Sequence, residues 1–206
     1  MPGKSAELKE NRREEIIDAC EKLYQSMNYR DITIKEISTE TSFSRPSIYN
    51  YFETKEEIFL ALLVREYHLW SSDLLALSQL EENLSADEFM KRFSEILEKR
   101  VMLLKITSMN LYEIEEHSRL ERLLEYKKEF LRAMEMVKRC LQRFFPEMTE
   151  QQMEDFRYAF FPFMYGIYPY VYPTAKQMQA MDTVGISVRK TTIAEMTYRF
   201  ISHFIH

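Results

Sequence analysis

The sequence is poor in glycine and proline, with three and six copies among its 206 residues. Folds built from many strands and tight turns use both residues more often, so their scarcity favours long helices joined by short connections. No apolar run reaches transmembrane length, and the charged N-terminus lacks the apolar core of a signal peptide, so we expect no membrane association. The apolar share of 46% excludes a disordered chain.

Thiols and histidines are also few, and their spacing does not indicate a metal site or catalysis. Cys20 and Cys140 stand alone on helical patterns, which is typical of a reduced, cytoplasmic protein. Glu113 and His117 stand four residues apart and could face one metal ion, but without a third ligand a solvated ion pair is the better interpretation. The pattern suggests no catalytic triad or dyad and no glycine-rich phosphate loop, so we expect neither enzyme activity nor a cofactor.

Residues 33–57 form the most informative segment of the chain. They read as two short helices separated by a tight turn, with a long helix starting directly behind them. Thr33 and Glu36 match a capping box, in which each side chain satisfies a backbone N–H of the other residue. Thr54 and Glu57 match a second box at the start of the long helix.

The middle helix of this segment has the form of a helix that reads DNA. Ser44 is a suitable N-cap, and Pro46 falls in the first turn, where its missing N–H costs nothing. The helix is barely two turns long and directs Ile48 and Phe52 inward. The side chains left on its outer face are Arg45, Ser47, Tyr49, Asn50 and Tyr51.

This segment resembles the TetR family of bacterial transcriptional regulators. The resemblance covers roughly residues 10–60, about a quarter of the chain. Two positions depart from the family pattern, because Ser42 stands where the family usually has glycine in the turn and Asn50 where it commonly has histidine. The turn is therefore expected to be strained or differently shaped. The residues that carry the resemblance are Ile34-Lys35-Glu36-Ile37-Ser38, Phe43-Ser44-Arg45-Pro46-Ser47-Ile48-Tyr49-Asn50-Tyr51-Phe52 and Lys55-Glu56-Glu57-Ile58-Phe59.

The resemblance implies a set of contacts to double-stranded operator DNA. Arg45, Ser47 and Asn50 are expected at base edges, and the remaining DNA-binding residues are Thr33, Ser44, Tyr49, Tyr51 and Lys55, mainly on phosphates. The net charge of −5 is unusual for such a protein, and residues 1–55 hold nine Lys and Arg against ten Asp and Glu. Because phosphate contacts are short-ranged in salt, local charge matters more than the total, and we expect weak non-specific DNA binding.

The whole chain is predicted to be all-α, with about nine helices. Residues 1–55 are expected to form a three-helix domain with the helix-turn-helix, and residues 56–206 a helical domain for effector binding and dimerisation. A long helix at residues 55–77 joins them. Beyond it we expect a capping box at Ser85 with Glu88 and helices at residues 109–117, 120–145, 149–172 and 188–205, the last preceded by a loop that contains Pro173 and Gly185.

Residues 156–173 are unusually aromatic, with nine Phe and Tyr among eighteen residues. Pro162 and Pro169 inside this pattern predict a kinked or interrupted helix. Aromatic side chains on nearly every face predict burial on more than one side, either against a partner subunit or around a ligand cavity. The residues predicted to form a homodimer interface are Phe160, Phe163, Met164, Met196, Phe200, Ile201 and Phe204.

These features together predict a ligand-responsive transcriptional regulator. We expect a repressor that binds a palindromic operator as a dimer and is released by a small hydrophobic or amphipathic effector, which would act on the helix at residues 55–77. The alternatives are a DNA-binding regulator without an effector and a helical enzyme or carrier. The residues predicted to bind the effector are Trp70, Phe89, Phe93, Met109, Tyr112, Phe130, Met134, Phe161 and Tyr165.

Overall fold

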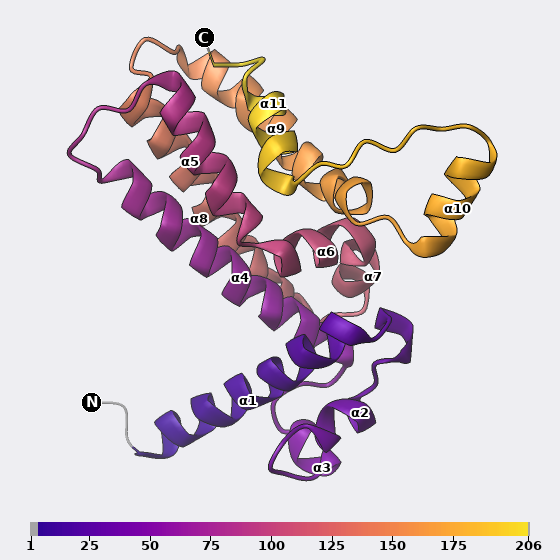
Figure 1. Ribbon diagram of the computed structural model, residues 1–206. Coiled ribbons are helices and arrows are strands. Elements are labelled where there is room, and N and C mark those ends of the chain that lie inside the picture. Colours follow the sequence, from indigo (N-terminus) through magenta and orange to yellow (C-terminus); the bar gives the residue numbers. More distant parts are fainter. Residues whose placement is uncertain (1–3, 206) are drawn as a thin grey trace. The chain divides into compact units, whose positions relative to one another are not determined.

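The computed structural model describes residues 4–205, which contain eleven α-helices, one short 3-10 turn and no strand (Figure 1). The all-α prediction is confirmed, with two helices more than the nine expected. Among these residues, no helix combines the length and the apolar character required to cross a membrane. The helices are α1 (Lys4–Ser26), α2 (Ile34–Thr39), α3 (Arg45–Ile48), α4 (Lys55–Ser78), α5 (Ala86–Glu98), α6 (Val101–Met109), α7 (Leu111–Glu116), α8 (Leu120–Phe144), α9 (Glu150–Val171), α10 (Ala175–Thr183) and α11 (Ile193–Ile201), and the 3-10 turn is Tyr29–Asp31.

The chain packs as two compact units. Unit 1 contains residues 4–65 and Asn110–Lys128, and unit 2 contains Glu66–Met109 and residues 129–205. Helices α4 and α8 each contribute residues to both units. The inclusion of Asn110–Lys128 in unit 1 was not predicted. The division into a DNA-binding domain at residues 1–55 and an effector-binding and dimerisation domain at residues 56–206 stays a prediction.

The core of unit 1 forms because α1, α2, α3 and the start of α4 each turn an apolar face inward. Ile16 and Cys20 of α1, one helical turn apart, are fully buried. The ring of Phe59 lies 5.0 Å from that of Tyr24 and 4.9 Å from that of Tyr29, centroid to centroid. This core fixes the α2–α3 segment.

The core of unit 2 is dominated by aromatic rings. Helix α11 packs against α5 and α9, and α6 packs against α9. The rings of Phe156 and Phe160 stack at 5.5 Å, and Phe93 meets Phe160 edge-on at 5.3 Å. Burial of these rings stabilises the fold of this unit.

Helix α9 is continuous, so of the two predicted alternatives, a kink and an interruption, the interruption is excluded. It runs through Pro162 and Pro169, and its capping box of Thr149 and Gln152 is present as predicted. Neighbouring side chains on both sides of Pro162, including the buried Phe160, hold the helix to the core. Packing therefore offsets the hydrogen bonds that the prolines cannot make.

The connection between α9 and α11 differs from the predicted loop. It contains α10, and α11 covers only Ile193–Ile201 of the helix expected at residues 188–205. Thr174 and Gln177 form a capping box at the start of α10. The sequence signal for this helix was present, but Pro173 and Gly185 were interpreted as loop residues.

Candidate DNA-binding and effector sites

Helix α2 begins at Ile34, with Thr33 as its N-cap, as the sequence predicts. The Thr33 hydroxyl oxygen accepts hydrogen bonds from the backbone N–H of Lys35 at 3.2 Å and of Glu36 at 3.4 Å. The Glu36 carboxylate contacts the Thr33 hydroxyl, whereas the capping box predicted a bond to the Thr33 backbone N–H. The helix start is confirmed, and the reciprocal bond is replaced by a side-chain contact.

The turn between α2 and α3 shows no sign of the predicted strain. No residue other than glycine in the described part of the chain has a positive φ, so Ser42 can occupy the turn without a glycine. The Glu15 carboxylate of α1 accepts bonds from the Ser42 backbone N–H and from its hydroxyl, the latter at 3.1 Å. Helix α1 thus holds the turn in place.

The candidate reading helix α3 has one anchored face and one exposed face. Ile48 and Phe52 are fully buried, as predicted. Arg45, Tyr49 and Asn50 are exposed, and Ser47 and Tyr51 are half-buried, while Ser44 and Thr33 lie exposed beside them. A guanidinium nitrogen of Arg45 donates to the Tyr49 hydroxyl at 3.2 Å. The outer face of α3 therefore presents an exposed cation and polar groups suited to a DNA groove.

Lys55 lies at the N-terminus of α4, where backbone N–H groups attract anions. Its Nζ donates to the carbonyl oxygen of Tyr29 at 2.9 Å and lies 4.1 Å from the centre of the Tyr29 ring. An ammonium group has three donors, so this bond leaves Lys55 able to contact a phosphate as well.

Arg119 and Arg122 make contacts to α4 and to the residues after α3 that sequence reasoning missed. Arg122 donates to the Tyr51 carbonyl oxygen at 3.1 Å, and its guanidinium carbon lies 5.7 Å from the centre of the Phe52 ring. Arg119 bonds the Glu57 carboxylate, with one nitrogen at 2.8 Å. No local pattern could reveal these pairs, because the partners are more than sixty residues apart in the chain.

The Glu57 carboxylate is buried and ionised. Burial disfavours its charge, but hydrogen bonds from Arg119 and from the backbone N–H of Glu53 outweigh burial and hold the Glu57 pKa below its usual range. The Glu53 bond is 2.8 Å long. The Glu57 backbone N–H donates to the Thr54 hydroxyl oxygen at 3.2 Å, so only half of the predicted capping box forms. The Glu57 side chain instead fixes residues 53 and 119 relative to α4.

The nine residues predicted to bind the effector are not equally enclosed. Trp70, Phe89, Phe93 and Phe161 are buried, and Phe130, Met134 and Tyr165 are half-buried, all in unit 2. Met109 and Tyr112 are 55% and 85% exposed, and Tyr112 belongs to unit 1, so the structure does not place these two in an enclosed site. Met109 is the last residue of α6, and Tyr112 lies in the first turn of α7. The apolar character of the two residues alone does not predict this exposed position.

Most of the enclosed residues form one cluster around Trp70. The Trp70 ring lies 6.0 Å from Phe161, and Phe130 lies 5.1 Å from Phe161 and 6.5 Å from Tyr165, centroid to centroid. The Trp70 indole N–H is buried and has no hydrogen-bond partner within residues 4–205. An unpaired buried donor is costly, so it marks a position where a bound molecule can accept a hydrogen bond.

The predicted dimer residues divide into two groups. Phe160, Met164 and Ile201 are fully buried in the core of their own chain, which leaves them no surface to offer to a partner. The half-exposed group is Phe163, Met196, Phe200 and Phe204, and within it Phe163 and Phe200 stack at 4.2 Å.

The outer face of α9 carries a different set of residues, which sequence reasoning did not single out. They stand four residues apart on one helix face, and all four are exposed: Tyr158, Pro162, Gly166 and Tyr170. Tyr158 is 87% exposed. A Cβ placed on Gly166 would meet nothing within 4 Å, so another helix can approach α9 closely here. The regular spacing of the four was the signal that could have identified this face.

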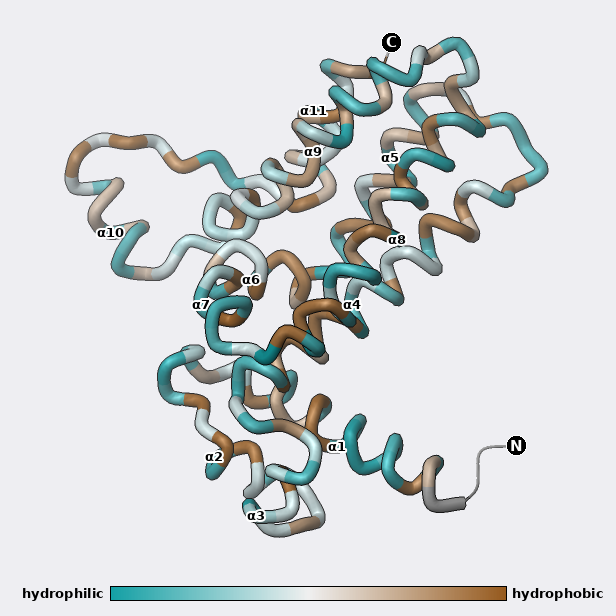
Figure 2. The backbone as a smooth tube through the Cα atoms, turned by 180° about the vertical axis from the view of Figure 1, so that it is seen from behind, coloured by the Kyte–Doolittle hydropathy of each residue, from teal (hydrophilic) through white to brown (hydrophobic). Residues whose placement is uncertain are grey.

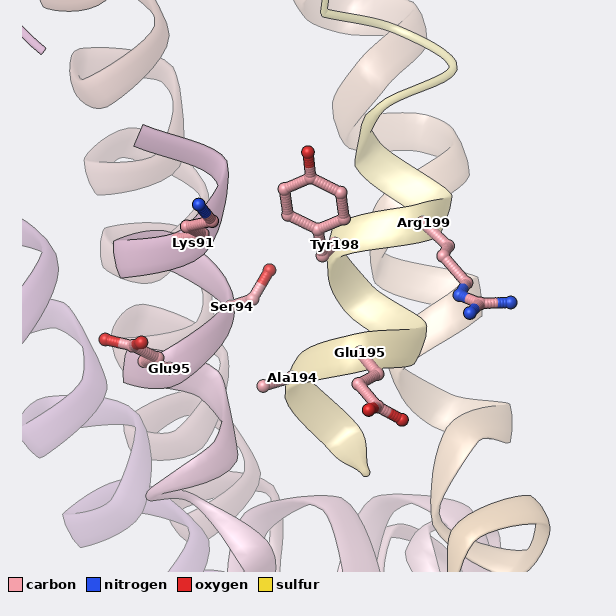
Figure 3. A pocket seen from close by; sticks show the side chains of 7 residues that line it. All are labelled: Lys91, Ser94, Glu95, Ala194, Glu195, Tyr198 and Arg199. Atoms are coloured by element: carbon pink, nitrogen blue, oxygen red, sulfur yellow. The ribbon is translucent and has the colours of Figure 1, made fainter. Parts of the chain in front are cut away.

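Two cavities of unit 2 adjoin α11. The smaller, of about 350 Å³, lies between α5 and α11, and Figure 3 shows Lys91 and Glu95 on one wall and Glu195 and Arg199 on the other. Its lining contains none of the nine predicted effector residues. The larger, of about 860 Å³, lies among the ends of α9, α10 and α11 and is lined by none of the nine predicted effector residues.

Family models match almost the whole chain. Residues 16–62 match the model of bacterial regulatory proteins of the tetR family, and residues 64–206 match the tetracyclin repressor-like C-terminal domain. The uncharacterized HTH-type transcriptional regulator YdgC of Bacillus subtilis (strain 168) is 30% identical over 80 residues, which are 39% of this chain and 40% of YdgC. YfiR of the same organism, also an uncharacterized HTH-type transcriptional regulator, is 31% identical over 62 residues, 30% of each chain. The chain thus spans two fifths or less of these relatives' length.

Solved structures share the fold over nearly the full length. The fatty acid degradation regulator FadR from Bacillus halodurans has a TM-score of 0.62 at 15% identity, with 94% of each chain covered. FadR from Bacillus subtilis, solved in complex with stearoyl-CoA, has a TM-score of 0.60 at 14% identity, with 93% of this chain and 96% of that chain covered. At these identities the likeness concerns the fold alone.

Proposed function

This chain belongs to the TetR family of bacterial transcriptional regulators, and from that premise we propose that it is a dimeric, cytoplasmic repressor that a small apolar effector releases from a palindromic operator. Regulators of this family act by binding DNA and are not enzymes. The observation that carries the proposal is the reading helix α3, which is anchored by Ile48 and Phe52 and exposes Arg45, Tyr49 and Asn50.

In the DNA complex, Arg45, Ser47 and Asn50 contact base edges. Arg45 is long enough to bind guanine through two hydrogen bonds, and this pairing would replace its bond to Tyr49. The phosphates are contacted by the remaining polar groups around the helix, namely Thr33, Ser44, Tyr49, Tyr51 and Lys55. Phosphate contacts set the orientation of the helix, and base contacts supply the sequence preference.

The chain binds DNA as a homodimer because one short reading helix contacts too few bases for specific recognition. The dimer surface is the outer face of α9 together with the half-exposed aromatic residues of α11. This placement explains why large side chains such as Tyr158 and Tyr170 are exposed in the single chain. A two-fold axis between the subunits makes the operator an inverted repeat.

The effector binds in unit 2 next to Trp70, whose indole N–H has no partner within residues 4–205 and whose ring contacts Phe161. Aromatic and methionine walls favour a largely apolar compound. Long-chain acyl compounds are the first to test, because the structurally similar FadR of Bacillus subtilis binds stearoyl-CoA. A thermal-shift screen detects binding, since a ligand at 100 times its Kd stabilises the folded chain by about 2.7 kcal/mol.

A second candidate is a DNA-binding regulator that has no small-molecule effector. The close ring contacts around Trp70 favour it, because the rings fill much of the space that a ligand would need. Both candidates give the same DNA binding. Only the first gives an apolar compound that stabilises the chain and weakens operator binding in parallel.

The DNA-binding part is tested by selection from a pool of random duplexes with the full chain. We expect enrichment of an inverted repeat whose half-sites are one helical turn, about 34–36 Å, or a multiple of it apart. Selection with the Arg45→Ala variant is the control and should return a less defined repeat. Failure of the wild-type chain to enrich any repeat would contradict the proposed function.

A further inference from the structure

The segment at residues 172–192, here named the arm, is a specified structure and not a loose connection. At its start Thr174 and Gln177 form a capping box, with bonds of 2.8 and 3.2 Å. At its end Gly185 has a φ of +77°, and the N–H of Ile186 donates to the Met181 carbonyl oxygen at 2.8 Å. These are the bonds of a helix stop that needs glycine, so both ends of α10 are encoded.

The arm nevertheless has no core of its own. No residue from Tyr168 to Thr192 is buried, and α10 stands apart from α9 and α11 (Figures 1 and 2). Large apolar side chains are exposed on it, with Val184 at 70% and Ile186 at 56%. A nine-residue helix is marginal in water without tertiary packing. Something outside this chain must therefore cover the arm.

The arm also encloses a large space that its own chain leaves open. The cavity of about 860 Å³ has Pro169 and Tyr170 of α9, Met196 of α11 and Met181 and Ile186 of the arm among its walls. These walls are apolar, but the guanidinium groups of Arg189 and Arg199 also line the cavity. An occupant must be apolar where it enters and acidic near the arginines.

The outer face of α9 carries an apolar surface and, nearer the start of the helix, an acidic side chain. Its exposed residues Tyr158, Pro162, Gly166 and Tyr170 are spaced symmetrically about residue 164. Two copies of α9 that cross antiparallel at this point would pair Tyr158 of one copy with Tyr170 of the other, and Pro162 with Gly166. Tyr170 is a wall of the cavity, so the partner's Tyr158 would reach it.

The charges agree with the same register. Asp155 lies one helical turn before Tyr158, is exposed and accepts a bond from Gln151 at 2.8 Å. In the antiparallel pairing Asp155 falls opposite Pro173 of the other copy, which is also a wall of the cavity. Its carboxylate would then face Arg189 and Arg199.

We propose that the arm clasps a second copy of this chain and that the cavity beside it receives the N-terminal half of the second copy's α9, with Tyr158 against Tyr170 and Asp155 near Arg189 and Arg199. The inference rests on the dimer of the proposed function and adds its register and the role of α10. By symmetry each dimer has two such contacts. The arm then folds against its partner, which explains why it is encoded but unpacked in one chain.

The register is tested with full-length copies that carry one new cysteine each. Copies with Tyr158→Cys are mixed with tagged copies with Tyr170→Cys, re-equilibrated and oxidised, and a disulfide-linked dimer containing one copy of each is expected. Each variant alone should cross-link poorly, because two copies of residue 158 would be about 18 Å apart along the helix axes. Tyr112→Cys, at an equally exposed tyrosine on α7, is the matched control with Tyr170→Cys.

The role of the arm is tested by sedimentation of Ile186→Asp, which should weaken dimerisation at least tenfold, whereas Tyr112→Asp should not. Both side chains are exposed in the single chain, so both variants should fold, and circular dichroism checks this. A wild-type monomer at micromolar concentration would overturn the proposed dimer itself. A wild-type dimer that shows neither the cross-link nor the Ile186→Asp effect would overturn the arm inference alone. An apolar compound whose binding is abolished by Ile186→Asp, without the cross-link, would assign the cavity to a ligand and also overturn the inference.

Discussion

Helices α3 and α10 both expose most of their side chains, but they are held in place in different ways. Helix α3 has only four residues, yet Ile48 within it and Phe52, four residues further along the chain, are fully buried in unit 1. Helix α10 has nine residues and none is buried. Capping bonds define the ends of α10, while core packing defines the position of α3.

Under the proposed function, the difference reflects where each helix finds its partner. A helix that reads DNA must keep its exposed face in a fixed orientation before it meets the groove, and the core of unit 1 provides this. A helix that is completed by a second copy needs no core of its own, because the dimer supplies one. Exposure alone therefore does not distinguish the two surfaces, whereas the anchoring of each helix does.

The largest expected effect follows from removing an anchor. Phe52→Ala should lower the free energy of unfolding by about 3–5 kcal/mol, because it opens a cavity in a fully buried site. The matched change on α10, Met178→Ala, should alter the stability of the monomer by about 0.5 kcal/mol or less. Urea unfolding of both variants at a concentration where the chain is monomeric measures the contrast. Equal losses would show that α10 is packed within its own chain.

A smaller effect is expected at the exposed face of α3. Arg45→Ala should reduce discrimination between the operator and a variant duplex by about 1–3 kcal/mol, since a two-bond contact to a base is lost. Lys176→Ala on α10 removes an equally exposed cation and should leave operator preference unchanged. Fluorescence anisotropy with the selected operator compares the two variants. An unaltered preference in Arg45→Ala would remove α3 from base recognition.

Lys55→Ala should act on all DNA sequences alike. The ammonium group sits at the N-terminus of α4 and would neutralise one phosphate, so the slope of log affinity against log salt should fall by about one unit. Operator and unrelated duplexes should weaken together, unlike in Arg45→Ala. A change confined to the operator would indicate that Lys55 contacts a base.

The smallest effect is expected for the ion pair of Glu57 with Arg119, through the dependence of Tm on pH. The lowered pKa of Glu57 means that its ionised form stabilises the folded chain above the usual glutamate range, and that this stabilisation is lost as the pH falls through the folded-state value. Wild-type Tm should therefore decline in acid below the usual glutamate range, and Glu57→Gln should remove that part of the decline. Thermal unfolding across the acidic range measures both. If the Tm of the wild type and of Glu57→Gln fell equally with pH, the Glu57–Arg119 ion pair would not determine the loss of stability in acid.

Local signals in the sequence predicted the helix starts well. The capping residues Thr33, Ser85 and Thr149 begin helices where expected, because a cap depends on only four consecutive residues. Thr174 and Gln177 carry the same signal, but Pro173 and Gly185 on either side predict a loop. The position of the α3 segment and the burial of Ile48 and Phe52 were predicted for the same reason, although α3 ends at Ile48 and is shorter than the expected two turns.

Features that depend on tertiary packing could not be predicted. The composition of α9 indicated two burials but not which side each ring faces, so it could not predict that Phe160 is fully buried and Tyr158 exposed. The Glu57–Arg119 pair joins residues far apart in the chain, and only the folded structure brings them together. The position of the effector depends on cavity shape and stays a prediction.

The central claim is that an effector bound next to Trp70 in unit 2 releases the DNA that unit 1 holds. Helices α4 and α8 have residues in both units, so a displacement of either helix would be carried along its length. The most direct test adds an apolar compound from the thermal-shift screen to the chain–operator complex and records Trp70 emission and operator anisotropy together. We predict that both signals change with the same midpoint and that operator affinity falls at least tenfold, which requires about 1.4 kcal/mol of coupling. Saturation of the Trp70 signal with unchanged operator affinity would contradict the account.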